Sequence, residues 1–158
     1  MPSYSFARAA ALLLLLAVPA KAADSGSDSG SQAAAPATAP ASGGITEAQA
    51  AIDAGQYAKA LRILAPVAKA EPKNADVWNL MGYSSRNLKN YNEAARYYAI
   101  ALRANPKHIG ALEYQGELFV ETGQFDQARQ NLKMLQSICG TCEEAMDLQS
   151  ALQAKGQG

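Results

Sequence analysis

The chain has few chemically reactive side chains and no long apolar stretch. Its 158 residues include one histidine, His108, and two cysteines, Cys139 and Cys142. The longest apolar run, Ala9 to Val18, has ten residues, whereas a membrane-spanning helix takes about 20. We therefore expect no membrane-spanning helix, and few positions where a catalytic or metal site could be built.

An excess of either charge is also missing. The chain has 14 Lys plus Arg and 14 Asp plus Glu, so its formal net charge is zero. Residues 1 to 22 contain Arg8 and Lys21 but no acid, so 12 bases and 14 acids remain when they are removed. Binding to nucleic acid requires basic side chains that neutralise phosphate groups. We therefore expect no nucleic-acid partner.

Residues 1 to 22 have the pattern of a secretory signal peptide. Arg8 precedes the apolar run, and Ala20-Lys21-Ala22 has the small-x-small form of a cleavage site. We predict cleavage near Ala22/Ala23. The mature protein is then expected to be periplasmic or secreted, with no membrane insertion after removal of the signal.

Residues 23 to 44 are predicted to be a disordered linker. They consist only of Ala, Ser, Gly, Pro, Thr, Asp and Gln. Such a segment has too little apolar surface to offset the entropy that folding removes.

From residue 45 onward the sequence repeats at a fixed interval. Residues of one kind recur 34 positions apart in three series, which are Tyr57, Tyr91 and Phe125; Ala60, Ala94 and Ala128; and Pro72 and Pro106. A period of about 34 is typical of an array in which each unit is a helix, a turn and a second helix.

The repeat resembles the tetratricopeptide repeat. Residues 75 to 107 have Trp78, Gly82, Tyr91, Ala94, Tyr98, Ala101 and Pro106 where that family has its packing residues, and Gly116, Phe125 and Ala128 follow in the next unit. The resemblance implies an all-α fold, a right-handed solenoid over residues 45 to 158. We expect three helix-turn-helix repeats, at about 45–74, 75–108 and 109–142, and a C-terminal capping helix at about 143–155.

Several local features refine this expectation. Pro66 lies inside the helix predicted to start at Tyr57, where it favours a kink. Gly82 lies within a helix, which suggests a close approach of two helices. Thr141 and Glu144 have the spacing of a capping box for the last helix.

Cys139 and Cys142 form a C-x-x-C motif where the earlier repeats have proline. We expect a structural disulfide, because thiols outside the cytoplasm are usually oxidised. A redox pair is an alternative, although a thioredoxin-like motif has its first cysteine at the start of a helix after a strand. A metal pair is a further alternative. Glu143 stands where c-type haem attachment needs histidine.

No catalytic motif is found in the chain. It lacks a phosphate-binding glycine loop, an H-E-x-x-H motif and a G-x-S-x-G motif. His108 follows Asn105-Pro106-Lys107 and is interpreted as a solvated turn residue rather than a catalytic base. We predict no enzyme activity, no cofactor and no metal site.

The resemblance also implies a concave groove lined by the first helix of each repeat. The groove residues would be Asn79, Tyr83, Arg86, Asn87, Glu113, Tyr114, Glu117 and Glu121. The acids of the third repeat would repel a peptide carboxylate. We expect the partner to be another protein or a peptide segment that is basic or amide-rich. The alternative is that these acids are only the solvated face of a helix.

Two functions remain open from the sequence. The first is a non-enzymatic protein–protein interaction scaffold or adaptor of the bacterial cell envelope, which binds a partner segment in the groove. The second is an accessory factor in periplasmic thiol-redox or metal handling that uses Cys139 and Cys142.

Overall fold

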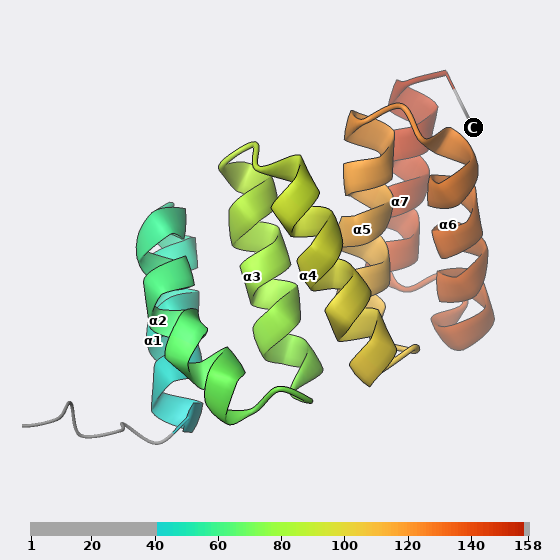
Figure 1. The fold of residues 1–158 in the computed structure, drawn as a ribbon. Coiled ribbons are helices and arrows are strands. Elements are labelled where there is room, and N and C mark those ends of the chain that lie inside the picture. The colour runs from blue at the N-terminus through green and yellow to red at the C-terminus, as the bar shows by residue number, and fades with distance from the viewer. Residues whose placement is uncertain (1–40, 157–158) are drawn as a thin grey trace, which may run out of the picture. The chain divides into compact units, whose positions relative to one another are not determined.

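The computed structural model describes residues 41–156, which form helices and no strand (Figure 1). In these residues the helices are α1 (Ala41–Asp53), α2 (Tyr57–Ala70), α3 (Ala75–Asn87), α4 (Tyr91–Ala104), α5 (Ile109–Glu121), α6 (Phe125–Cys139) and α7 (Glu143–Ala154). They lie in one compact unit. The predicted signal peptide, and the predicted linker up to residue 40, lie outside the described residues.

The helices stack in sequence order (Figure 1). Each helix packs against the next along the chain, and α1, α3, α5 and α7 also contact one another in turn. We call these four the A helices, because three of them begin the predicted repeats. The all-α helical solenoid is thereby confirmed.

The residues expected to pack the repeats lie between the helices. Ala94, Tyr98, Ala101 and Ala128 are completely buried. Tyr91 and Phe125 are half-buried, and Pro106 lies exposed in the turn after α4. The small and aromatic positions of the repeat therefore bring neighbouring helices together.

Trp78 and Gly82 connect α3 to its neighbours. The Trp78 indole donates a hydrogen bond to the Pro72 carbonyl at 2.9 Å and stacks on Tyr97 at 5.9 Å between ring centres. Gly82 lies against the Tyr98 ring, so that a Cβ at residue 82 would be 2.5 Å from Tyr98 Cε1. The close approach predicted from Gly82 is therefore a contact with an aromatic ring of α4.

Gly116 has a different neighbour from Gly82, although the two occupy the same position in successive repeats. A Cβ at Gly116 would collide with the side chain of Leu148, which is completely buried in α7. The last helix thus inserts a leucine against α5, and covers the end of the core formed by α5 and α6.

Helix α1 begins at Ala41, four residues before the domain boundary predicted at residue 45. The predicted boundary is therefore wrong by about one helical turn. A Cβ on Gly44 would be only 2.7 Å from Val67 Cγ2 of α2, which explains why glycine occupies this position in the helix. Its small size allows α1 and α2 to approach closely.

Helix α2 continues through Pro66 from Tyr57 to Ala70. Proline removes one backbone donor from the helix. Pro66 is exposed, so water can reach the carbonyl that loses this donor. The neighbouring Val67 and Ala68 are buried and keep the helix packed.

The predicted capping box at the start of α7 is wrong. The N-cap of α7 is Cys142 rather than Thr141, and no side chain of the described residues caps the helix. Cys142 is bonded to Cys139, the last residue of α6, with 5.6 Å between their Cα atoms. Gly140 supplies the positive φ of 69° between the two cysteines. The disulfide and this glycine, rather than a hydroxyl cap, define the turn.

His108 caps α5, so the interpretation as a solvated turn residue is wrong. Its Nδ1 accepts a hydrogen bond from the Ala111 amide at 3.1 Å, and its Nε2 lies 2.9 Å from Asp76 Oδ1. The side chain is only 12% exposed. A neutral imidazole with its proton on Nε2 satisfies both contacts. His108 therefore fastens the start of α5 to the start of α3.

Candidate functional site

Arg86 joins α3 to α5 at the centre of the predicted groove. Its guanidinium lies 2.6 Å from Glu117 and 2.9 Å from Glu121, and its side chain is 11% exposed. Burial alone would lower the pKa of Arg86, but the carboxylates, Glu117 first, outweigh burial and raise it. One cation of the second repeat thus holds two acids of the third.

Aromatic rings surround this ion pair. Tyr83 and Tyr114 are 4.9 Å apart between ring centres, and the Arg86 guanidinium carbon lies 5.8 Å from each centre. Tyr57 of α2 adds an edge contact to Tyr83 at 6.2 Å. Burial raises the pKa of Tyr114 to about 12. We call Tyr83, Arg86, Tyr114, Glu117 and Glu121 the Arg86 cluster.

The acidity predicted for the third repeat is therefore partly neutralised. Glu117 and Glu121 both pair with Arg86, and Lys89 lies 3.9 Å from Glu121. Both acids therefore already have a cation partner within the chain and are not simply solvated charges. The three acids therefore differ, because Glu117 and Glu121 pair with Arg86 whereas Glu113 does not.

Glu113 is buried without a partner for its carboxyl group. It is 7% exposed, and within residues 41–156 its side chain forms no hydrogen bond or ion pair. Burial, followed by the charges of Glu117, Asp147 and Glu144, raises the pKa of Glu113 to about 8, against a smaller lowering by Arg86. The carboxyl group is therefore largely protonated at neutral pH.

Helix α7 adds Glu144 and Asp147 to the same surface, although it was predicted only as a cap. Asp147 follows Glu113 by one full period of the repeat, as Glu113 follows Asn79, so the period does continue into α7. Contacts of α7 with α5 confirm its place as a further A helix. The surface lined by α3, α5 and α7 is called the inner surface below.

The two asparagines predicted to line the groove differ in whether their side-chain amides already have hydrogen-bond partners. Asn87 Nδ2 donates to the Tyr83 carbonyl within α3 at 2.9 Å. Asn79 is 8% exposed, and its Oδ1 is buried with no hydrogen-bond partner among residues 41–156. Asn79 Nδ2 would be 3.3 Å from a Cβ on Gly110, at the start of α5. Asn79 thus lies between α3 and α5.

Two further buried polar atoms belong to Arg86 and to its neighbour Tyr98. Tyr98 Oη and Arg86 Nε have no hydrogen-bond partner in the part of the chain that the structure describes. Burial raises the pKa of Tyr98, although the nearby Arg86 charge opposes the change. Tyr98 is therefore a neutral packing residue, and Arg86 uses its two terminal nitrogens for the carboxylates.

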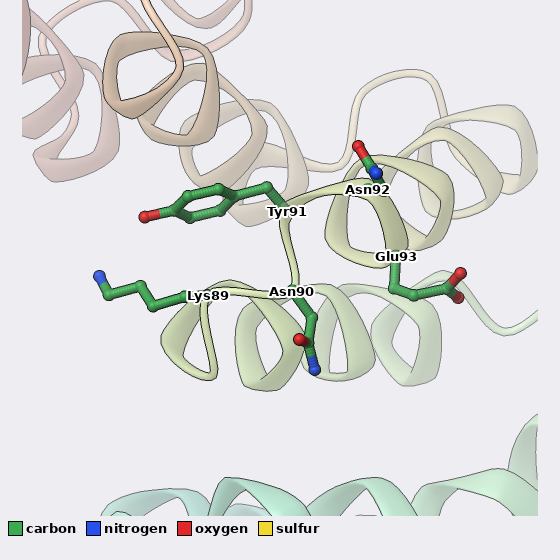
Figure 2. A pocket seen from close by; sticks show the side chains of 5 residues that line it. All are labelled: Lys89, Asn90, Tyr91, Asn92 and Glu93. Carbon is green, nitrogen blue, oxygen red and sulfur yellow. The ribbon is translucent and has the colours of Figure 1, made fainter.

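A surface depression of about 480 Å³ lies at the turn between α3 and α4. Its lining residues are Lys89, Asn90, Tyr91, Asn92 and Glu93. Figure 2 shows that Lys89 and Tyr91 extend to one side, whereas Glu93 points to the other. Lys89 itself lies 5.9 Å from the Tyr91 ring. The side chains diverge, so this depression does not gather groups around a ligand.

Two other kinds of site are missing from the described part of the chain. No helix within residues 41–156 is long and apolar enough to cross a membrane. In the same residues no three His, Cys, Asp or Glu side chains are placed to share a metal ion. The inner surface is therefore the candidate site with the most convergent polar groups.

Solved structures with the same arrangement of helices include several tetratricopeptide domains. The first such domain of Spaghetti (RPAP3), bound to the HSP90 peptide SRMEEVD, has a TM-score of 0.67 and 17% identity, over 73% of this chain and 95% of that one. The Arabidopsis OM64 domain has a TM-score of 0.67 and 15% identity, over 73% and 95%. The Yersinia enterocolitica type III secretion translocator chaperone SycD has a TM-score of 0.66 and 15% identity, over 72% and 89%. At these identities the likeness concerns the fold.

Sequence comparison gives the same family. Human protein O-mannosyl-transferase TMTC3 is 29% identical over 70 residues, which are 44% of this chain and 8% of that protein. The chain thus spans less than a tenth of the length of that relative. A family model described as tetratricopeptide repeat matches residues 45–109 and 80–138, and the chain belongs to the tetratricopeptide repeat family.

Proposed function

We propose that this protein is a non-enzymatic adaptor that holds a segment of another protein on its inner surface. Tetratricopeptide domains are protein–protein interaction modules, and a similar fold in Spaghetti (RPAP3) holds an HSP90 peptide. The observation that carries the proposal is the continuous inner surface of α3, α5 and α7, with its paired tyrosines and partly unpaired acids.

The charge of this surface argues against an acidic peptide such as SRMEEVD. Arg86 is the one cation of the Arg86 cluster, and two carboxylates already pair with it. Glu113, Glu144 and Asp147 lie nearby. A carboxylate-rich segment would meet charges of its own sign, which is costly at close range. We therefore propose a basic or amide-rich partner segment.

We further propose that the adaptor acts outside the cytoplasm, in the bacterial envelope or after secretion. Support comes from the signal-peptide pattern of residues 1 to 22, with its cleavage site near Ala22/Ala23. A mature N-terminus near Ala23, found by N-terminal sequencing, is the expected result. A protein that retains Met1 to Ala22 would contradict the proposal.

The partner site can be tested by photo-crosslinking in living cells. A photoreactive phenylalanine analogue replaces Tyr83 on the inner surface, or Arg96 on α4 as a matched control. Arg96 lies exposed in a pair with Glu93 at 2.8 Å. We expect covalent adducts of defined mass from position 83 in at least tenfold excess over position 96. Equal adducts from both positions would contradict an inner-surface site.

Thiol-redox handling remains the second candidate function, and it is favoured by one observation, the bonded pair Cys139–Cys142. Replacement of both cysteines by serine distinguishes the two functions. For the adaptor we expect unchanged crosslinks from position 83, with unfolding made easier by about 2 kcal/mol through loss of a short disulfide loop. Loss of all crosslinks in a variant that still folds would favour the thiol function. Circular dichroism melting curves check the fold.

A further inference from the structure

The inner surface contains two buried oxygen acceptors without donors. Glu113 of α5 and Asn79 of α3 are both buried. Within residues 41–156, the fully buried Asn79 Oδ1 has no hydrogen-bond partner. The Glu113 carboxyl group, whose oxygens are not fully buried, forms no hydrogen bond or ion pair there either. Buried polar groups are nearly always paired in native proteins, and an unpaired one is costly. Of the two, the Glu113 carboxyl group is the one that can still be reached from outside, and it points to a donor from another molecule.

Asn79 and Glu113 come from neighbouring helices, and Glu113 faces the inner surface. Asn79 lies against Gly110, one turn of α5 before Glu113. The charges that act on Glu113 belong to Arg86 of α3, Glu117 of α5, and Glu144 and Asp147 of α7. These residues come from all three helices of the inner surface. The Glu113 carboxyl group therefore faces that surface.

The donor that fits is a cation with several hydrogens and no acceptor. An ammonium group has three donors on a narrow aliphatic stem, whereas guanidinium favours a planar, two-pronged contact with one carboxylate. A metal ion fits less well, because no three acidic or other ligand side chains converge within residues 41–156.

We propose that Glu113 binds the ammonium group of a lysine side chain from the partner segment, with Glu144 and Asp147 supplying further negative charge. This proposal rests on the proposed adaptor function, and specifies one anchor residue of the partner.

The site should respond to pH. The groups that face Glu113 are Arg86 from α3, Tyr114 and Glu117 from α5, and Glu144 and Asp147 from α7. The pKa of Glu113 is raised to about 8, so near neutral pH an incoming ammonium group must displace a proton. Rising pH ionises Glu113 while a lysine, with a pKa of about 10.4, stays charged. Binding is therefore expected to strengthen from pH 6.5 to pH 8.5 and then to level off.

The test uses three pools of nine-residue peptides, with randomised positions drawn from Ala, Gly, Leu, Ser, Thr, Tyr and Asn. The first has a central lysine and blocked ends, and the second has a central Nε-acetyl-lysine and blocked ends. The third has a free N-terminus as its only ammonium group. Retention on the immobilised full chain is measured by mass spectrometry. Glu113→Gln is compared with Glu93→Gln, the same substitution in the exposed pair on α4.

We expect the lysine pool to be retained at least tenfold better than the acetyl-lysine pool at pH 8, and about tenfold better at pH 8 than at pH 6.5. Glu113→Gln should abolish both differences and Glu93→Gln should preserve them. Because Gln resembles the protonated acid, Glu113→Gln should fold normally, as circular dichroism would show.

Three results would overturn the lysine site. Equal retention of the lysine and acetyl-lysine pools would do so, as would an undiminished preference in Glu113→Gln. Better retention of the free N-terminus pool would exclude a lysine side chain as the source of the ammonium group. If no pool is retained, and position 83 also gives no specific crosslinks, the adaptor function fails together with the site.

Discussion

Replacement of Arg86 by methionine is expected to lower the free energy of unfolding by about 3 kcal/mol. Methionine keeps much of the apolar stem but removes the charge that lies between Glu117 and Glu121. Those two carboxylates would then remain on α5 with only the distant, exposed Lys89 beside Glu121. Removing one partner of a buried ion pair is costly, because the remaining charge stays desolvated.

Urea unfolding at pH 7 measures this effect, with Arg96→Met as the matched control. Arg96 forms an exposed pair with Glu93, and exposed pairs of this kind contribute less than about 1 kcal/mol. Glu117→Gln in the Arg86→Met background should recover part of the loss. If Arg86→Met costs no more than Arg96→Met, the Arg86 cluster does not hold the second and third repeats together.

Replacement of Gly82 by alanine is expected to cost about 2 kcal/mol. The added Cβ would meet three atoms of the Tyr98 ring at 2.5 to 2.9 Å. That ring is completely buried, and it is too rigid to bend away. Alanine gains about 1 kcal/mol over glycine in helix propensity, so a net loss would show that packing dominates at this position.

Thermal unfolding measures the change, and a second background isolates its cause. In Tyr98→Leu the ring is gone, so adding Gly82→Ala should be neutral or stabilising. The same loss in both backgrounds would mean that the collision with Tyr98 is not the reason for glycine at residue 82.

The repeat period predicted most of the fold because each of its positions has a packing reason. Helix α4 spans Tyr91 to Ala104 and lies within the second predicted repeat. Ala94 and Ala101 must be small where helices touch, and they are completely buried. Such constraints act within one repeat or between neighbours, so spacing alone reveals them.

Pairings between side chains of different helices could not be predicted in the same way. The family resemblance implied that Arg86, Glu117 and Glu113 share one surface, but their spacing does not determine which acid the arginine reaches. That choice depends on the offset of α5 against α3, which the His108–Asp76 contact helps to fix. The early start of α1 was missed because glycine usually disfavours helices, and here close packing against Val67 outweighs that preference.

The capping role of α7 was predicted, but its acids on the inner surface were missed for another reason. The turn before it has Gly140 where the earlier repeats have proline, and no residue after that turn was assigned to the groove. The helix keeps the repeat positions nonetheless, because Asp147 stands one full period after Glu113. Continuing the count through an atypical turn would have revealed the additional acids.

The inner surface has a direction. Asn79, Glu113 and Asp147 occupy the same step of the period on α3, α5 and α7. Along that row an uncharged amide is followed by a carboxyl group with a pKa of about 8, and then by an exposed acid on the last helix. Negative potential therefore rises from one edge of the row to the other. A partner segment with unevenly distributed charge would therefore bind across this row in one preferred direction, with its more basic end over α7.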